Sequence, residues 1–330
     1  MNLPLRAICV AAAGAFTLAN AAEAQTRDKF VYALSWLPQA EHCGFFQAKA
    51  TGAYERLGLD VELMPGGPGQ NTAQLVAAGK ADAGMGTAMS SLNMRNNNIP
   101  GVTVAAMLQK SPSTLVAHPD PALKSLEDLK SRKLSIANFS RTQFWVWLKA
   151  KYGFDDGQLR PYTYNPSTFV ADKTLVQQGY ITEDDFFIGK AVGGPIHTFL
   201  LADYGYPDYA SSIFTTETVI EKRRDALQRF VNGSIEGYTQ CAKGDPTPAF
   251  EAIRAAHQEQ SFELSAFKVA QMKKYGMIDG GDAATMGAGA MTDARWKQVF
   301  EIMADGGVFP KDMDYKKAYT LDFVNKKIGM

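Results

Sequence analysis

The sequence has 330 residues, and its 34 basic and 34 acidic residues balance to a net charge of zero. A neutral chain without a basic block gives no electrostatic reason to bind nucleic acid or an anionic membrane, and we expect neither as a partner. Three cysteines are too few for a disulfide scaffold, and this length exceeds one typical domain and suggests two lobes.

The first 24 residues have the pattern of an export signal. Arg6 supplies the charged start, and the apolar run 7–19 is too short to anchor the chain in a bilayer. Small-residue motifs predict cleavage near Ala24 and therefore a periplasmic protein, and no later segment looks transmembrane. Cleavage leaves Cys43 and Cys241, which an exported compartment permits to pair, although the sequence leaves the pairing open.

Strand and helix signals alternate along the rest of the chain. Strands are predicted at 29–36, 59–65, 81–85, 102–108, 114–118, 133–137, 159–164, 186–188, 198–202 and 212–215. Helices are predicted at 44–57, 71–78, 90–96, 125–130, 142–151, 169–178 and 218–242, and then at 248–259, 263–275 and 293–304. Such alternation favours parallel sheets in an α/β fold.

The segment 109–118, followed by two prolines, has the composition of a crossing between lobes, and the strand at 212–215 reads as the return. This places lobe 1 at 25–117 plus 216–330 and lobe 2 at 118–215. A chain that leaves one lobe and comes back makes a two-strand hinge, which is the arrangement of proteins that close around a ligand.

A polar and aromatic cluster follows the first predicted strand. Trp36, Glu41, His42 and Phe45 supply an indole, a carboxylate, an imidazole and a phenyl ring within ten residues. In α/β proteins, sites form at the carboxyl ends of parallel strands. This set of side chains suits a small planar polar molecule better than a metal or a nucleic acid.

A glycine-rich loop, GGPGQN, follows the second strand. It lacks the Lys-Ser/Thr of a phosphate-binding loop, and Asn71 is a good N-cap for the next helix. A turn with a helix cap and a ligand-contacting loop at Gly66 and Gly67 therefore remain equal alternatives.

The sequence shows no pattern of a catalytic or metal centre. The four histidines are scattered without ligand spacing, and Gly-x-Ser-x-Gly is missing. His42 and Cys43 are adjacent, but neighbouring side chains point in different directions and rarely form a thiol–imidazole pair. We expect no catalytic residue, no metal and no cofactor.

The predicted helix at 142–151 carries several aromatic residues. Phe144 and Trp147 share one face and are expected in the core. Trp145 lies on another face near the N-terminal end of the helix, where a ligand site would be. Arg141, just before this helix, is either a ligand contact or a solvated surface charge, with the second slightly favoured.

Several segments together resemble the substrate-binding proteins of ABC importers. The nearest are those related to thiamine-pyrimidine-precursor binding and synthesis proteins, a group that neighbours the nitrate, sulfonate and taurine binders. The resemblance rests on WLPQAEHCGFFQAKATGAYERLGLDVELMPGGPGQN (36–71), LVAAGKADAGMGTA (75–88), TLVQQGYITEDDFF (174–187), LLADYGYPDYASSIFTT (200–216), MTDARWKQVFE (291–301) and YTLDFVNKKIGM (319–330).

The resemblance implies a type II periplasmic-binding-protein fold, with two α/β lobes and a ligand between them. Ligands of such proteins are often flat heterocycles, held by aromatic stacking and by carboxylates that read ring nitrogens or amino groups. On the matching positions, Trp36 and Tyr180 become stacking candidates and Glu41, Asn71 and Glu183 become polar contacts. The full candidate ligand-binding set is Trp36, Glu41, His42, Phe45, Gly66, Gly67, Asn71, Thr87, Ser90, Trp145, Tyr180 and Glu183.

The leading hypothesis is therefore a monomeric binding protein, not an enzyme, that captures a planar nitrogen heterocycle and delivers it to membrane permease subunits. One alternative is a nitrate-, sulfonate- or taurine-type anion binder, for which Lys110 and Arg141 are the only plausible cations. A weaker alternative is a pyrimidine-forming enzyme that uses His42. Eukaryotic relatives of that kind carry a cysteine-rich motif and use a vitamin B6 cofactor, and this chain has no cysteine cluster.

Overall fold

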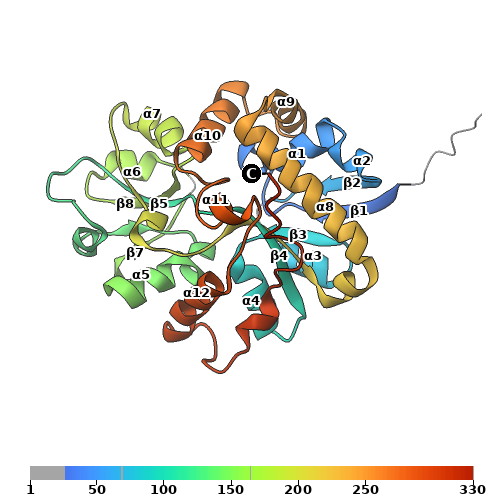
Figure 1. The fold of residues 1–330 in the computed structure, drawn as a ribbon. Coiled ribbons are helices and arrows are strands. Elements are labelled where there is room, and N and C mark those ends of the chain that lie inside the picture. Colours follow the sequence, from blue (N-terminus) through green and yellow to red (C-terminus); the bar gives the residue numbers. More distant parts are fainter. Residues whose placement is uncertain (1–26, 68–69, 164, 330) are drawn as a thin grey trace, which may run out of the picture.

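The computed structural model describes residues 27–67, 70–163 and 165–329, so the expected export signal lies outside the described residues. The chain forms two α/β lobes side by side, each built around a five-stranded sheet (Figure 1). Sheet A, in lobe 1, has the order β2-β1-β3-β10-β4, and sheet B, in lobe 2, has the order β7-β6-β8-β5-β9. The expectation of two α/β lobes is confirmed.

The strands are β1 (Asp28–Ala33), β2 (Leu59–Met64), β3 (Ala83–Gly86), β4 (Gly101–Leu108), β5 (Ser113–Ala117), β6 (Leu134–Ser135), β7 (Leu159–Arg160), β8 (Val176–Tyr180), β9 (His197–Leu200) and β10 (Ala210–Thr216). The helices are α1 (Cys43–Ala50), α2 (Ala53–Arg56), α3 (Thr72–Ala77), α4 (Ala88–Asn96), α5 (Phe144–Tyr152), α6 (Ser167–Ala171), α7 (Lys190–Val192), α8 (Glu217–Lys243), α9 (Thr247–Ala256), α10 (Phe262–Lys274), α11 (Ala283–Met286) and α12 (Asp293–Asp305). Short helical turns include η1 (Ala40–His42), η3 (Phe139–Thr142) and the π-helical turn η5 (Asp185–Gly189).

The chain changes lobes one strand away from the predicted boundaries. β5 pairs with β8 and β9 in sheet B, whereas β10 pairs with β3 and β4 in sheet A. The crossings therefore fall at 109–112 and at 201–209, not after residue 117 and after residue 215. Turn signals locate a break in the chain, but they do not tell which sheet the next strand joins.

Both sheets are mixed, which corrects the expectation of parallel sheets. β1 runs parallel to β2 and β3, while β10 is antiparallel to both β3 and β4. In sheet B, β5 is likewise antiparallel to β8 and β9. The two antiparallel strands, β5 and β10, are the first strands after the two crossings. Each therefore starts at the edge of the sheet where its neighbours end, and runs in the opposite direction to them.

Two local predictions in lobe 2 were wrong. The expected helix at 169–178 ends at Ala171, and its second half forms β8, the central strand of sheet B. Pairing with β5 and β6 there outweighs local propensity. The expected strand at 186–188 is part of the π-helical turn η5, because so short an apolar run does not separate strand from helix.

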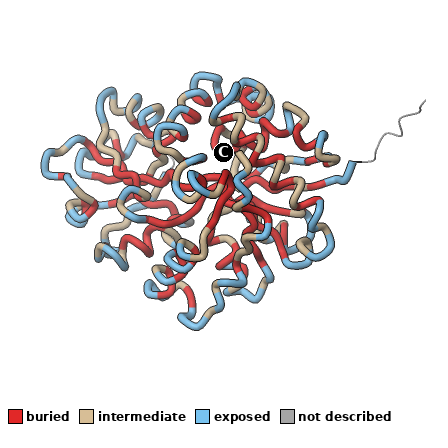
Figure 2. The backbone as a smooth tube through the Cα atoms, viewed as in Figure 1, coloured by how far each residue is buried: buried red, intermediate tan, exposed pale blue. Residues whose placement is uncertain are grey.

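Buried residues follow the strands and the inner faces of the helices in both lobes (Figure 2). In lobe 1 the core is aromatic: Phe230 of α8 stacks on Phe30 with ring centroids 4.5 Å apart and lies 4.8 Å from the ring of Tyr32. No helix in the described ranges is long and apolar enough to cross a membrane.

Helices α1 and α8 meet at a close crossing that we call the α1–α8 junction, formed by Cys43, Gly44, Gly237, Tyr238 and Cys241. Cys43 and Cys241 form a disulfide, which answers the question that the sequence left open. A Cβ atom on Gly237 would lie 1.9 Å from the Gly44 carbonyl oxygen, and one on Gly44 would lie 2.0 Å from the Tyr238 ring. Only glycine allows the two backbones to approach this closely.

Candidate functional site

In both sheets, the strands other than β5 and β10 have their carboxyl ends toward the crossings between the lobes. β1, β2 and β3 are parallel, so the loops that follow them, which carry Trp36, Gly66 and Thr87, lie at one edge of sheet A. In sheet B, Tyr180 at the end of β8 pairs with Ser113 at the start of β5, directly after the first crossing. Residues that follow strands in both lobes therefore gather between the lobes.

A buried ionic group joins the two lobes, and we call it the interlobe cluster: Glu41, His42, Thr182, Glu183 and Lys268. The Lys268 ammonium of α10 lies 3.3 Å from Glu41 Oε2 and 2.6 Å from Glu183 Oε2, and its side chain is fully buried. The Thr182 hydroxyl donates to Glu41 Oε1 at 2.6 Å. Glu41 lies in η1 of lobe 1, and Thr182 and Glu183 follow β8 in lobe 2. Two of the three predicted polar contacts, Glu41 and Glu183, therefore lie on the same ammonium.

The interlobe cluster carries more negative than positive charge. Burial works against the ammonium, but the carboxylates of Glu41 and Glu183 raise the pKa of Lys268 above its usual range. Burial also opposes ionisation of Glu41, yet the charge of Lys268 and the hydrogen bond from Thr182 lower the pKa of that carboxyl. One ammonium thus faces two carboxylates, and the uncompensated charge favours a ligand that presents N–H donors or a positive group.

His42, a member of this cluster, is buried with unused hydrogen-bonding capacity. It is 1% exposed, and neither ring nitrogen has a hydrogen-bond partner among the residues that the structure describes. Burial lowers the pKa of His42 to about 4; Glu41 opposes this shift and Lys268 adds to it. The neutral imidazole therefore offers one donor and one acceptor, and such unpaired buried groups are rare unless they serve a function.

This burial predicts a pH-dependent stability. The unfolded imidazole titrates near pH 6.5, whereas the pKa of His42 in the fold is about 4, so stability is lost as pH falls through that window. Between pH 7 and pH 5 we expect the wild type to lose roughly 2 kcal/mol of unfolding free energy relative to His42→Gln. Urea unfolding at both pH values measures this difference.

Buried carboxyls change the unfolding free energy with pH in the opposite direction, but the wild type and His42→Gln contain the same carboxyls. Burial raises the pKa of Asp184 to about 7 and of Asp208 to about 6, so both groups favour the fold at lower pH. Comparison of wild type with variant removes their contribution. Equal pH dependence in the two proteins would show that His42 is not the buried titrating group.

Two predicted ligand contacts lie in lobe interiors, which removes them from the candidate site. The Phe45 ring packs against Tyr32 and Tyr238, with centroids 4.6 and 5.2 Å apart. Trp145 is 1% exposed, and its indole N–H donates to Asp156 at 2.7 Å. Helix α5 is buried on several faces at once, so the face of Trp145 that looked free in the sequence is also covered.

The glycine and hydroxyl candidates serve mainly as turns and caps in this conformation. Gly66 donates to the Trp36 carbonyl at 3.1 Å, and a Cβ atom there would lie 2.4 Å from the Leu34 oxygen. Asn71 Oδ1 accepts from the backbone N–H of Gln74, as an N-cap of α3. Thr87 and Ser90 form a reciprocal capping box at α4. Trp36 in the loop after β1 and Gly67 in the loop after β2 are both half-buried. Tyr180 is also half-buried, and its backbone N–H donates to Asp184 at 2.8 Å.

Sequence reasoning missed the buried charges that organise this region. Lys268 lies four residues after Leu264 and four before Met272, on the buried face of α10. Its spacing from these apolar residues could have indicated in the sequence that the lysine is buried. Asp208 was also missed: it accepts from the backbone N–H of Ala88 at 3.1 Å and so occupies the start of α4.

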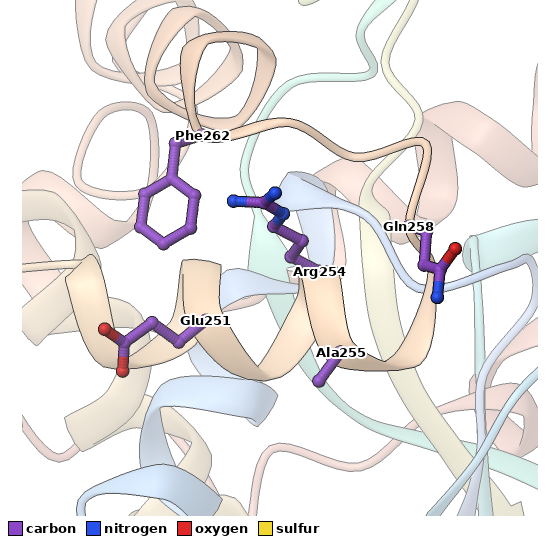
Figure 3. A pocket seen from close by; sticks show the side chains of 5 residues that line it. All are labelled: Glu251, Arg254, Ala255, Gln258 and Phe262. Carbon is purple, nitrogen blue, oxygen red and sulfur yellow. The ribbon is translucent and has the colours of Figure 1, made fainter.

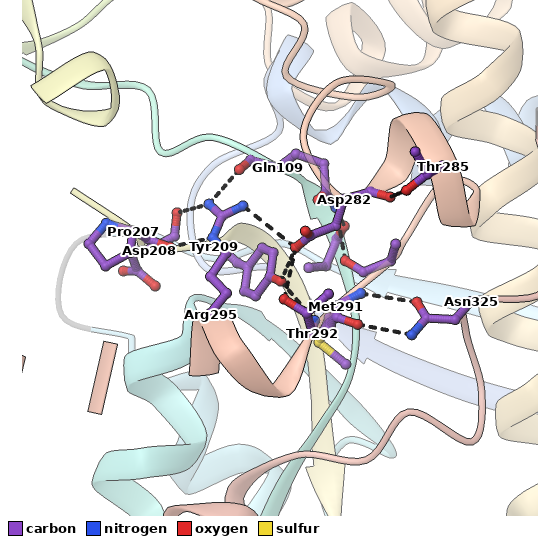
Figure 4. Close-up of polar contacts among 12 residues, drawn as sticks. Gln109, Pro207, Asp208, Tyr209, Asp282, Thr285, Met291, Thr292, Arg295 and Asn325 are labelled. Carbon is purple, nitrogen blue, oxygen red and sulfur yellow. Dashed lines mark hydrogen bonds and ion pairs between the residues drawn. The ribbon is translucent and has the colours of Figure 1, made fainter. Parts of the chain in front are cut away.

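Arg295 of α12 holds both crossings of the hinge (Figure 4). Its guanidinium donates to the Gln109 carbonyl of the first crossing and to the Pro207 and Asp208 carbonyls of the second. The same group stacks on the Tyr209 ring at 4.0 Å. The two chain segments that connect the lobes are thus tied together by one side chain.

Two surface hollows lie away from the interlobe cluster. One, of about 660 Å³, lies over α9 and the start of α10 and is lined by Glu251, Arg254, Ala255, Gln258 and Phe262 (Figure 3). The other, of about 410 Å³, is lined by residues 119–121 and 195–198. Within the described ranges, no group of three or more His, Cys, Asp or Glu residues is placed to hold a metal ion.

Comparison with known proteins gives consistent results. Residues 39–249 match the family model described as NMT1/THI5 like. A riboflavin-binding protein of Chloroflexus aurantiacus is 24% identical over 94% of this chain and 91% of its own length. A formylaminopyrimidine-binding protein of Halalkalibacterium halodurans is 22% identical over 70% of this chain and 71% of its own. A 4-amino-5-hydroxymethyl-2-methylpyrimidine phosphate synthase of Saccharomyces cerevisiae is 24% identical, but over only 35% of each chain.

Among solved structures, the periplasmic aliphatic sulphonate binding protein of Escherichia coli superposes with a TM-score of 0.66. That match covers 88% of this chain and 91% of the other at 12% identity, so it establishes the fold alone. The periplasmic-binding-protein fold expected from the sequence is confirmed. The riboflavin-binding and formylaminopyrimidine-binding relatives match this chain over most of their own length.

Proposed function

The chain belongs to the NMT1/THI5-like family, and from that premise we propose that it is the substrate-binding protein of an ABC importer. In this proposal it is exported to the periplasm, acts as a monomer, captures a small planar nitrogen heterocycle between its lobes and delivers it to membrane permease subunits. The observation that carries the proposal is the interlobe cluster, where a neutral unpartnered imidazole lies beside an excess of carboxylate charge.

The chemistry of the cluster suits a heterocycle that carries N–H and ring-nitrogen groups. The carboxylates of Glu41 and Glu183 accept from amino or ring N–H groups, and His42 supplies both a donor and an acceptor. Trp36, half-buried after β1, is the stacking candidate, and stacking of a base on an aromatic ring contributes about 1–3 kcal/mol. Tyr180 is its counterpart in lobe 2.

The mechanism that follows is closure of the lobes on the ligand. Glu41 and Trp36 belong to lobe 1, whereas Tyr180 and Glu183 belong to lobe 2, so a ligand that contacts both sets stabilises the closed conformation. The riboflavin- and formylaminopyrimidine-binding relatives support a flat nitrogen heterocycle as the ligand class.

The anion-binding alternative has weaker electrostatic support. Lys110 pairs with Asp203 at 3.1 Å on the surface, and Lys268 is outnumbered by the carboxylates around it. Arg141 favours this alternative, because its Nε is buried without a hydrogen-bond partner among the described atoms. For the enzyme alternative, thiol chemistry by a Cys43–His42 pair is excluded, because Cys43 is held in a disulfide and offers no thiol to His42.

Replacement of Trp36 by alanine is expected to weaken heterocycle binding about tenfold or more, because a stacking surface worth at least 1.4 kcal/mol is lost. Trp36→Phe keeps a ring and should retain most of the affinity. Thermal-shift titration with aminopyrimidines, flavins and alkanesulfonates identifies the ligand class first, and calorimetric titration then compares the variants.

Two outcomes oppose this proposal. Stabilisation by sulfonates or inorganic oxyanions alone would favour the anion alternative. A Trp36→Ala protein that melts much earlier yet binds with unchanged affinity would show that the indole supports the fold and not the ligand.

A further inference from the structure

The lobes meet along α10 through a short segment of lobe 2. Residues 182–190 approach α10 and η1 through three kinds of contact: the buried bridge from Lys268 to Glu183, the surface ion pair Lys190–Glu263 at 3.6 Å, and the rings of Phe186 and Phe267 with centroids 5.8 Å apart. In Figure 1, α10 lies between α7 of lobe 2 and α9 of lobe 1. The two lobes are thus joined along α10 by both ionic and aromatic contacts.

These contacts differ greatly in how much they contribute to holding the lobes together. Lys190 and Glu263 are both exposed, and an exposed pair of this kind contributes little. Lys268 is fully buried and its two partners come from different lobes. Loss of one partner from a buried ion pair is far more damaging than loss of a surface pair.

Lys268 also decides the sign of the electrostatic force between the lobes. With the ammonium present, Glu183 of lobe 2 is attracted to lobe 1. Without it, the half-buried carboxylate of Glu183 and the buried carboxylate of Glu41 are left on the two sides of the interface with no ammonium between them, and like charges repel. A single side chain therefore converts repulsion across the interface into attraction.

We propose that Lys268 is a positioning residue that draws the two lobes together before ligand arrives and so presets the binding site in its closed form. The inference rests on the proposed function only for its effect on ligand affinity. Its structural part, closure of the ligand-free protein, stands independently of what the protein binds.

Small-angle X-ray scattering of the ligand-free full chain tests the structural part. Lys268→Met, which keeps length and removes charge, should enlarge the radius of gyration relative to wild type. The triple change Glu41→Gln, Lys268→Met and Glu183→Gln removes the repulsion as well and should return the radius toward the wild-type value. Lys190→Ala, which breaks only the exposed pair, should leave it unchanged.

A second variant protects the test if Lys268→Met does not fold. Thr182→Val with Glu183→Gln removes the lobe 2 side of the bridge while Glu41 and Lys268 stay paired within lobe 1, and it should open the protein as well. Folded variants that keep the wild-type scattering profile would overturn the proposal.

Where a ligand has been found, we expect about tenfold weaker binding by Lys268→Met, because the closed form of the site is less populated in that variant. Failure to find a heterocycle ligand would count against the proposed function and leave the scattering result intact.

Discussion

A protein in which both Cys43 and Cys241 are replaced by alanine is expected to lose about 2–5 kcal/mol of unfolding free energy. The disulfide joins residues 198 positions apart in the chain, and closure of so long a loop constrains the unfolded state strongly. The chain-entropy estimate for this separation is about 5 kcal/mol, which we take as an upper value. Urea unfolding followed by circular dichroism, without reductant, measures the loss.

The same variant should bind ligand more weakly even where it is folded. Cys43 directly follows Glu41 and His42, and the Tyr238 hydroxyl of α8 donates to the Glu41 carbonyl at 2.8 Å. The disulfide and this hydrogen bond together fix η1 against α8. Single replacement of either cysteine serves as the control and should cost a similar amount. An unchanged urea midpoint in all three variants would contradict the prediction.

Replacement of Gly237 by valine is expected to destabilise the protein by about 3 kcal/mol or more. The first side-chain atom would lie 1.9 Å from the Gly44 carbonyl oxygen and 2.9 Å from the Ala48 nitrogen, so α1 and α8 would have to separate. Because backbone atoms and not a flexible side chain block the space, rotamer changes cannot relieve the clash. Thermal unfolding monitored by circular dichroism tests this.

Gly194→Ala provides the matched control for that experiment. An added Cβ there meets nothing within 4 Å, and the melting temperature should stay close to that of the wild type. If Gly237→Val melts with the control, the two helices do not approach each other as closely as described.

The fold was predictable where local pattern and long-range pairing agree. The long amphipathic helix expected at 218–242 and the helices expected at 263–275 and 293–304 appear within one residue of those bounds. The helix expected at 248–259 begins at Thr247 but ends three residues early, at Ala256. Pairing of β8 with strands far away in the chain is invisible in the local sequence TLVQQGY, which explains the helix expected there. The boundary between lobes failed for the same reason, since β5 and β10 are placed by partners distant in the chain.

The site was predictable only in part. Glu41 and His42 were predicted from the polar cluster after the first strand and Glu183 from the family resemblance, and the structure brings all three to one interlobe cluster. Their contact with a ligand stays a prediction. Phe45 and Trp145 were misplaced because an aromatic residue beside a loop packs into a core as readily as against a ligand. Lys268 was missed because a charged residue on a helix is usually solvated, and only its register on the apolar face indicates otherwise.

The position of β10 bears on the order in which the molecule can assemble. β10 lies between β3 and β4 in sheet A, although it is the last strand of the chain. During synthesis, β1 to β4 emerge first but leave a gap that only residues 210–216 fill, whereas the strands of sheet B are complete by Leu200. Lobe 1 is therefore an unfinished sheet with open edges until about two thirds of the chain has been made. Such a delay would help to keep the N-terminal half unfolded during translation, the state in which a polypeptide can be threaded across a membrane.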